Sequence, residues 1–132
     1  MPGHEHPDER PPIVIVDADR RVRQSLADLL TLAGLPVVAT AGTVAEALAV
    51  VELTQPTILL VDPRLPDVDA GAALVAAVPD VDPGVRVILM GWSDALEQPA
   101  LLTRSDGYLP KGSTPEEFVA AALAVCGCEA LA

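Results

Sequence analysis

Short continuous runs of large apolar residues alternate along the chain with longer segments whose apolar residues recur at helical spacing. The continuous runs predict strands at 13–16, 57–62 and 85–90, and two shorter strands are predicted at 36–40 and 106–109. The run at 57–62 leads directly into Pro63 and is typical of a strand that is buried on both faces. Five predicted helices alternate with these strands, and this alternation indicates a parallel sheet covered by helices on both faces.

Capping residues and helix-breaking residues mark where the predicted helices begin and end. Asp19 is the predicted N-cap of the first helix, which we expect to end at Gly34. Thr43 and Thr114 each precede a glutamate at capping-box spacing, so each predicts a helix start. The other expected boundaries are a helix end at about Thr54, a helix over about 70–78 that stops before Pro79, a short helix that Ser93 caps and Pro99 shortens, and a final helix that ends near Gly127.

Composition limits the class of protein. A chain of 132 residues with 51% hydrophobic residues can form one domain with a core, expected over 12–128, behind a disordered polar tail at 1–11. The formal net charge of −11 argues against nucleic-acid binding by this segment. We expect no membrane span, since no apolar run reaches 18 residues. Cys126 and Cys128 are expected to be free thiols, which favours a reducing, cytoplasmic location.

Three ionisable residues follow different predicted strands. Asp17 comes after the first strand, Asp62 after the third and Lys111 after the fifth. Because the carboxyl ends of parallel strands meet at one edge of a sheet, these side chains should converge there. Taken one at a time, each aspartate also fits a turn cap and the lysine also fits a solvated position. Lys111 is the only lysine in the chain, however, and this supports a specific role.

Two carboxylates and a lysine at a sheet edge suit phosphoryl chemistry. Carboxylates can hold Mg²⁺, and one of them can act as the nucleophile that forms an aspartyl phosphate. The lysine would then pair with the phosphoryl oxygens. The sequence contains neither a Walker loop nor a GxGxxG motif, so it does not indicate the nucleotide sites that those motifs form.

Three segments carry a resemblance to a known family: the acidic turn at 16–19, the stretch at 60–67, and Gly107 to Lys111. In their order and spacing they resemble the receiver domain of two-component response regulators, over about residues 12–127. The resemblance implies a flavodoxin-like, three-layer α/β/α fold whose five parallel strands have the order 2-1-3-4-5. It also implies a signalling module in a phosphorelay rather than an enzyme.

The resemblance also implies roles for individual residues. Asp62 takes the position that accepts a phosphoryl group from a sensor histidine kinase. Asp17, Asp62 and the backbone carbonyl of Arg64 take the positions of the Mg²⁺ ligands. Lys111 takes the position that pairs with the phosphoryl group, and Tyr108 that of the aromatic residue that turns inward on activation.

Two positions depart from the family pattern. Ala18 stands where a second acid is usual and offers no oxygen to a metal, so Mg²⁺ binding should be weak or absent. Asp19 is a further candidate ligand, although its position also suits a helix cap. Gly91 stands at the switch position, where a threonine or serine hydroxyl is usual, and the bulky Trp92 follows it. The Arg64 guanidinium either folds over the acids in place of the metal or points to solvent.

Three hypotheses follow from these observations. The first is an atypical receiver that signals with weak or no Mg²⁺-dependent phosphorylation and binds a partner protein, a second copy of itself or a small ligand. The second is a working phospho-receiver that a sensor histidine kinase switches at Asp62. The third, a flavodoxin-like enzyme, lacks any cofactor loop. An output domain, a homodimer or another signalling protein is an expected partner in the first two cases.

Overall fold

A computed structural model of the chain describes residues 10–92, 101 and 104–126. Five strands form one parallel sheet with the order β2-β1-β3-β4-β5, as expected. The strands are β1 (Ile13–Val16), β2 (Val37–Ala41), β3 (Ile58–Val61), β4 (Arg86–Gly91) and β5 (Gly107–Pro110). The predicted strand positions are therefore confirmed to within one or two residues at each end.

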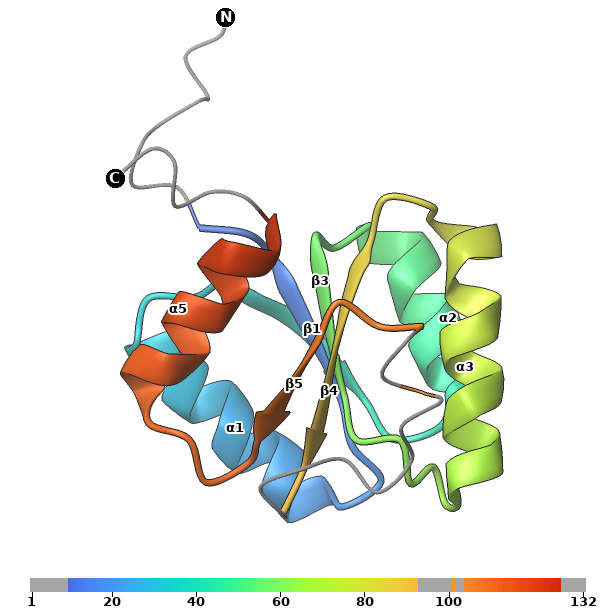
Figure 1. Cartoon of the computed structure of the whole chain (residues 1–132), viewed down its shortest axis with the longest axis horizontal. Helices are drawn as coiled ribbons and strands as arrows, with labels where there is room; N and C mark the ends of the chain where they lie inside the picture. The colour runs from blue at the N-terminus through green and yellow to red at the C-terminus, as the bar shows by residue number, and fades with distance from the viewer. Residues whose placement is uncertain (1–9, 93–100, 102–103, 127–132) are drawn as a thin grey trace, which may run out of the picture.

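Helices cover both faces of the sheet. They are α1 (Arg20–Leu32), α2 (Val44–Thr54), α3 (Val68–Val81) and α5 (Pro115–Cys126). In Figure 1, α1 and α5 lie on one side of the strands and α2 and α3 on the other. Alternate residues of a strand pack into two separate cores, because successive side chains of a strand point to opposite faces. Val14 and Val16 belong to the core under α2 and α3, while Ile13 and Ile15 belong to the core under α1 and α5.

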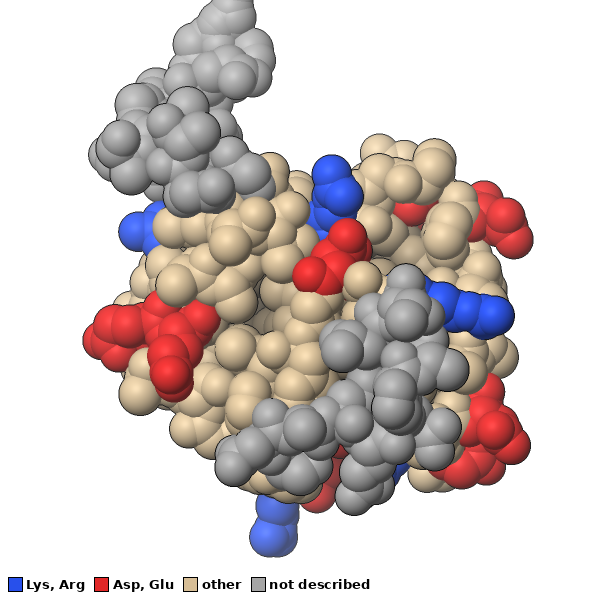
Figure 2. Space-filling model, viewed as in Figure 1, with Lys and Arg blue, Asp and Glu red and all other residues tan. Residues whose placement is uncertain are grey.

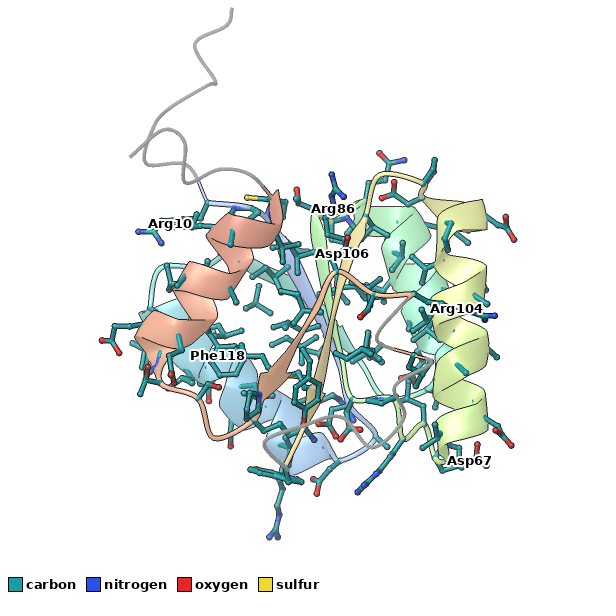
Figure 3. All side chains as sticks on the ribbon, in the orientation of Figure 1. Arg10, Asp67, Arg86, Arg104, Asp106 and Phe118 are labelled. Carbon is teal, nitrogen blue, oxygen red and sulfur yellow. The ribbon has the colours of Figure 1, made fainter. Side chains whose placement is uncertain are left out.

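The phenyl ring of Phe118 is the largest fully buried side chain. It points from α5 toward the sheet and belongs to the same core as Ile15 and Leu60 (Figure 3). Aromatic residues make up only 2% of the chain, so aliphatic side chains build nearly all of both cores.

Three predicted caps form in the structure. The Asp19 carboxylate accepts hydrogen bonds from the backbone N–H groups of Arg21 and Val22 at the start of α1. At α5 the capping box is reciprocal, because Thr114 accepts from the N–H of Glu117 and the Glu117 carboxylate accepts from the N–H of Thr114. Thr43 likewise caps α2. Local side-chain chemistry alone therefore determined these helix starts.

The expected boundaries of α3 were wrong at both ends. The helix begins at Val68 because Asp67 is its N-cap, with its carboxylate accepting from the N–H of Ala70. It also continues through Pro79 to Val81. A proline in the last turn removes only one helical hydrogen bond, and the buried contacts of Val78 one residue earlier hold the turn in place. Packing against the sheet thus outweighs a local helix-breaking signal.

Some expectations fall on residues that the structure does not describe. Residues 1–9 of the tail expected at 1–11, and the helix that Ser93 caps and Pro99 shortens, lie outside the described ranges. Pro11 of the expected tail is buried, and α5 extends to Cys126, one residue before the expected end near Gly127. Cys126 is disulfide-bonded, so the free thiol expected for it is wrong and the argument for a reducing compartment loses that support. None of the described helices combines the length and the apolar character that crossing a membrane requires.

Candidate functional site at the carboxyl edge of the sheet

The acid–lysine cluster, which consists of Asp17, Asp62 and Lys111, lies at the carboxyl edge of the sheet. The parallel register of β1 and β3 pairs Val16 with Val61, so the two aspartates that follow them lie side by side. The backbone N–H of Asp62 donates to the carbonyl of Val16, which continues this pairing beyond the strands. All three residues are buried, with relative exposures of 2%, 8% and 7% for Asp17, Asp62 and Lys111.

The Lys111 ammonium group joins the two carboxylates. Its Nζ lies 2.5 Å from Oδ2 of Asp17 and 2.5 Å from Oδ2 of Asp62. Burial lowers the pKa of Lys111, but the hydrogen bonds and negative charges of Asp17 and Asp62 outweigh burial and raise the pKa above its ordinary value of 10.5. The lysine is therefore charged at neutral pH, and the cluster carries a net charge of about −1 when both acids are ionised.

The remaining carboxylate oxygens bind the backbone of the following loops. Asp17 Oδ1 accepts from the N–H of Asp19, and Asp62 Oδ1 accepts from the N–H of Arg64. The loop after β3 contains a cis peptide bond between Leu65 and Pro66. Each acid is thus held by an ammonium group on one oxygen and by a backbone amide on the other, and this arrangement fixes the directions of both carboxylates.

Arg23 is a positioning residue that the sequence interpretation missed. Its Nη1 donates to the backbone carbonyl of Asp17 at 3.0 Å. A Cβ atom at Gly42 would lie 2.7 Å from the same Nη1, so the glycine leaves the room that the guanidinium occupies. The sequence signal for Arg23 was its place within the first two turns of a helix that follows an acidic strand end. Arg20 and Arg21 share that place, so the signal did not distinguish Arg23 from them.

The β4–β5 border, which consists of Gly91, Trp92 and Tyr108, lies beside the cluster. A Cβ atom built on Gly91 would meet the Tyr108 hydroxyl oxygen at 2.6 Å, which is closer than real Cβ contacts. The Tyr108 side chain therefore occupies the space that a side chain at position 91 would need. Tyr108 is half-buried and packs against the core under α2 and α3. The sequence predicted a missing hydroxyl at this position, but it did not predict that Tyr108 fills the space.

The other predicted site residues lie around the cluster without entering it. Ala18 is exposed and Asp19 uses its carboxylate as the α1 cap. Arg64 is exposed, and the cation that lies between the two acids is Lys111. Among the residues that the structure describes, no group of three or more His, Cys, Asp or Glu side chains is arranged to hold a metal ion.

Comparisons with known proteins agree with this fold. Residues 13–123 match the family model described as the response regulator receiver domain. The chain is 34% identical over 118 residues to a transcriptional regulatory protein, NarL, of Mycobacterium tuberculosis, which covers 87% of this chain and 54% of that protein. It is also 34% identical over 109 residues to the transcriptional regulatory protein YhcZ of Bacillus subtilis, over 81% of this chain and 51% of that protein.

A solved structure of the signal receiver domain of the M. tuberculosis NarL superposes with a TM-score of 0.72 at 29% identity, and it covers 90% of this chain and 98% of the solved one. The chain therefore belongs to the family of response regulator receiver domains, the signalling modules of two-component systems. It spans about half the length of the curated relatives that it matches.

Proposed function

We propose that this receiver domain signals with weak or no Mg²⁺-dependent phosphorylation at Asp62. The observation that carries the proposal is the contact between Gly91 and Tyr108. With glycine at position 91 there is no hydroxyl to bond a phosphoryl group on Asp62, and the tyrosine already occupies the space beside β4. The event that phosphorylation would trigger at this border therefore lacks its hydroxyl group, and the aromatic ring already lies in the space beside Gly91.

The acid–lysine cluster supports the same proposal. Mg²⁺ would need oxygen ligands, and Asp17, Asp62 and the carbonyl of Arg64 are the groups that this chain can offer. Ala18 adds no oxygen, and the Asp19 carboxylate is engaged by two backbone amides. The Lys111 ammonium already neutralises part of the charge that would attract the metal. The residues present are thus a poor fit to Mg²⁺.

A working phospho-receiver is the second candidate, and the cluster geometry favours it. Asp17, Asp62 and Lys111 are brought together at the edge where open α/β sheets bind ligands. A carboxylate in the Asp62 position can attack a phosphoryl donor, and the nearby ammonium can stabilise the transferred group. In this case a sensor histidine kinase would be the partner and Asp62 the modified residue.

One phosphorylation experiment separates the two candidates. The protein is incubated with Mg²⁺ and acetyl phosphate, and its intact mass is measured beside that of Asp62→Asn. We expect no phosphoryl adduct, and no saturable change in Trp92 fluorescence with Mg²⁺ or beryllofluoride. A stoichiometric adduct that Asp62→Asn abolishes would establish the second candidate instead.

A restored variant supplies the positive control. Ala18→Asp returns a carboxylate to the metal site, and Gly91→Thr returns a hydroxyl to the switch position. If the missing groups are the cause, the double variant should gain Mg²⁺-dependent phosphorylation that the parent protein lacks. A double variant as inert as the parent would mean that another feature of the chain blocks the reaction.

The partners follow from the same reasoning. We infer that the domain acts in the cytoplasm, within a regulator that passes the signal to an output domain, a second copy or another signalling protein. NarL and YhcZ are described as transcriptional regulatory proteins, and this chain matches about half of each. The net charge of −11 argues that any nucleic acid would be bound by a different segment. Figure 2 shows acidic side chains spread over the visible face rather than gathered at one place.

A further inference from the structure

A cavity of about 340 Å³ opens beside the acid–lysine cluster. The aliphatic side chains of Val22, Leu26 and Leu29 on α1 form one part of its lining, and Trp92 and Lys111 form another. Its volume is within the range of sites that hold small molecules. Trp92 is 66% exposed, although tryptophan is usually well buried. An exposed indole beside an aliphatic wall is suited to a flat apolar ring.

The Lys111 ammonium group contacts the Trp92 indole but is not available to a ligand. Its Nζ lies 5.2 Å from the centroid of the Trp92 ring, within the range of a cation–π contact. The same ammonium binds the carboxylates of Asp17 and Asp62. Its charge is therefore already matched, and an anionic group placed near it would meet two buried acids.

Arg21 provides a cation that is available. Its side chain lines the cavity and is exposed, and within the described part of the chain it makes no ion pair and no side-chain hydrogen bond. Ser25 lines the cavity one helical turn further along α1, so its hydroxyl lies on the same face of the helix. An arginine and a hydroxyl at this spacing can bind the two oxygens of one carboxylate.

We propose that this cavity binds a small aromatic carboxylate. The ring packs between Trp92 and the aliphatic side chains of α1, and the carboxylate binds Arg21 and Ser25, which are exposed on α1. The binding itself depends only on the cavity. A role for the ligand as the input signal rests on the proposed function, since a receiver without phosphorylation needs another input.

The test is a titration of the ¹⁵N-labelled protein with 2-naphthoate, without Mg²⁺ or a phosphodonor. Trp92 is the only tryptophan, so its indole N–H gives one unambiguous signal. We expect a saturable shift of this signal and of α1 amides. Uncharged 2-naphthamide should bind about ten-fold more weakly, because it cannot form the charged pair with Arg21.

Two matched variants locate the carboxylate. Arg21→Gln should weaken naphthoate binding about ten-fold and leave naphthamide binding unchanged. Arg20→Gln removes the same charge from the neighbouring exposed residue, which does not line the cavity, and should leave both affinities within about two-fold of the parent. Ser25→Phe fills the cavity from an exposed helix position and should abolish the shift.

Several results would overturn the proposal. These are the absence of a saturable shift, equal binding of acid and amide, or equal losses in Arg21→Gln and Arg20→Gln. A Trp92 signal that moves with protein concentration and is insensitive to naphthoate would instead show that a second copy covers this face. None of these results tests phosphorylation. A phosphoryl adduct on Asp62 would contradict the proposed function but would leave the result for naphthoate binding unchanged.

Discussion

The acid–lysine cluster and the β4–β5 border lie side by side at one edge of the sheet, but they differ in what they retain. In the cluster every charged group has a partner, and the Lys111 ammonium joins both acids at 2.5 Å. At the border a glycine has replaced the expected hydroxyl residue, and Tyr108 fills the space. The cluster therefore depends on matched charges, whereas the border depends on how the Tyr108 ring fills space.

The largest expected effect comes from removing the cation of the cluster. Lys111→Met leaves Asp17 and Asp62 buried side by side without a counter-charge, which should lower the unfolding free energy by about 3 kcal/mol. Urea denaturation at neutral pH measures the loss. Adding Asp17→Asn and Asp62→Asn to Lys111→Met should recover most of it, because the uncompensated charges are then gone. No recovery would mean that lost packing, not charge, caused the effect.

The border should respond to added volume rather than to lost charge. Gly91→Thr places a Cβ atom where the Tyr108 hydroxyl now lies, so the ring must move and the unfolding free energy should fall by about 1–2 kcal/mol. In a Tyr108→Ala background the same substitution should be close to neutral, because the obstructing ring is absent. A double-mutant cycle by urea denaturation measures this coupling. Additive losses would show that Tyr108 does not occupy the space beside position 91.

Substitutions of Asp19, which caps α1 beside the cluster, should have a smaller effect on stability. Asp19→Ala removes the α1 cap and should cost about 1 kcal/mol of unfolding free energy, whereas Asp19→Asn keeps a capping side chain and should be nearly neutral. Thermal denaturation of both variants measures the difference. If Asp19→Asn were as unstable as Asp19→Ala, the carboxylate charge itself would be required, and capping alone would not explain the residue.

We expect the smallest effect in the pH dependence of the stability that Lys111 contributes, which should be flat around neutral pH. The pKa of Lys111 is raised above 10.5, so the stability that its charged form contributes is fully present below that pH and is lost only as the pH rises through the folded-state pKa. The difference in unfolding free energy between the parent and Lys111→Met should therefore stay constant from about pH 7 to pH 9 and shrink above about pH 10.5. A difference that changed between about pH 7 and pH 9 would contradict the raised pKa of Lys111.

Local sequence signals predicted most of the framework. Continuous apolar runs determined the central strands β1, β3 and β4 because a strand buried on both faces needs apolar residues nearly throughout, as in Ile58–Val61. Caps such as Asp19 and Thr114 determined helix starts because their hydrogen bonds reach only two or three residues along the chain. Pro79 was misinterpreted for the opposite reason, since the burial of Val78 depends on the sheet, which a local pattern does not contain.

The sequence alone specifies which residues reach the carboxyl edge of the sheet. Once the strands are parallel, Asp17, Asp62 and Lys111 must follow their carboxyl ends, and Ala18 and Gly91 can supply no polar side chain. The contacts that those residues make there depend on the tertiary structure. Lys111 is 94 residues from Asp17 and 49 from Asp62, so its bonds to both acids depend on strand order and register. The contact of Tyr108 with Gly91 likewise arises from the pairing of β4 with β5, because local patterns specify elements and only their packing specifies contacts.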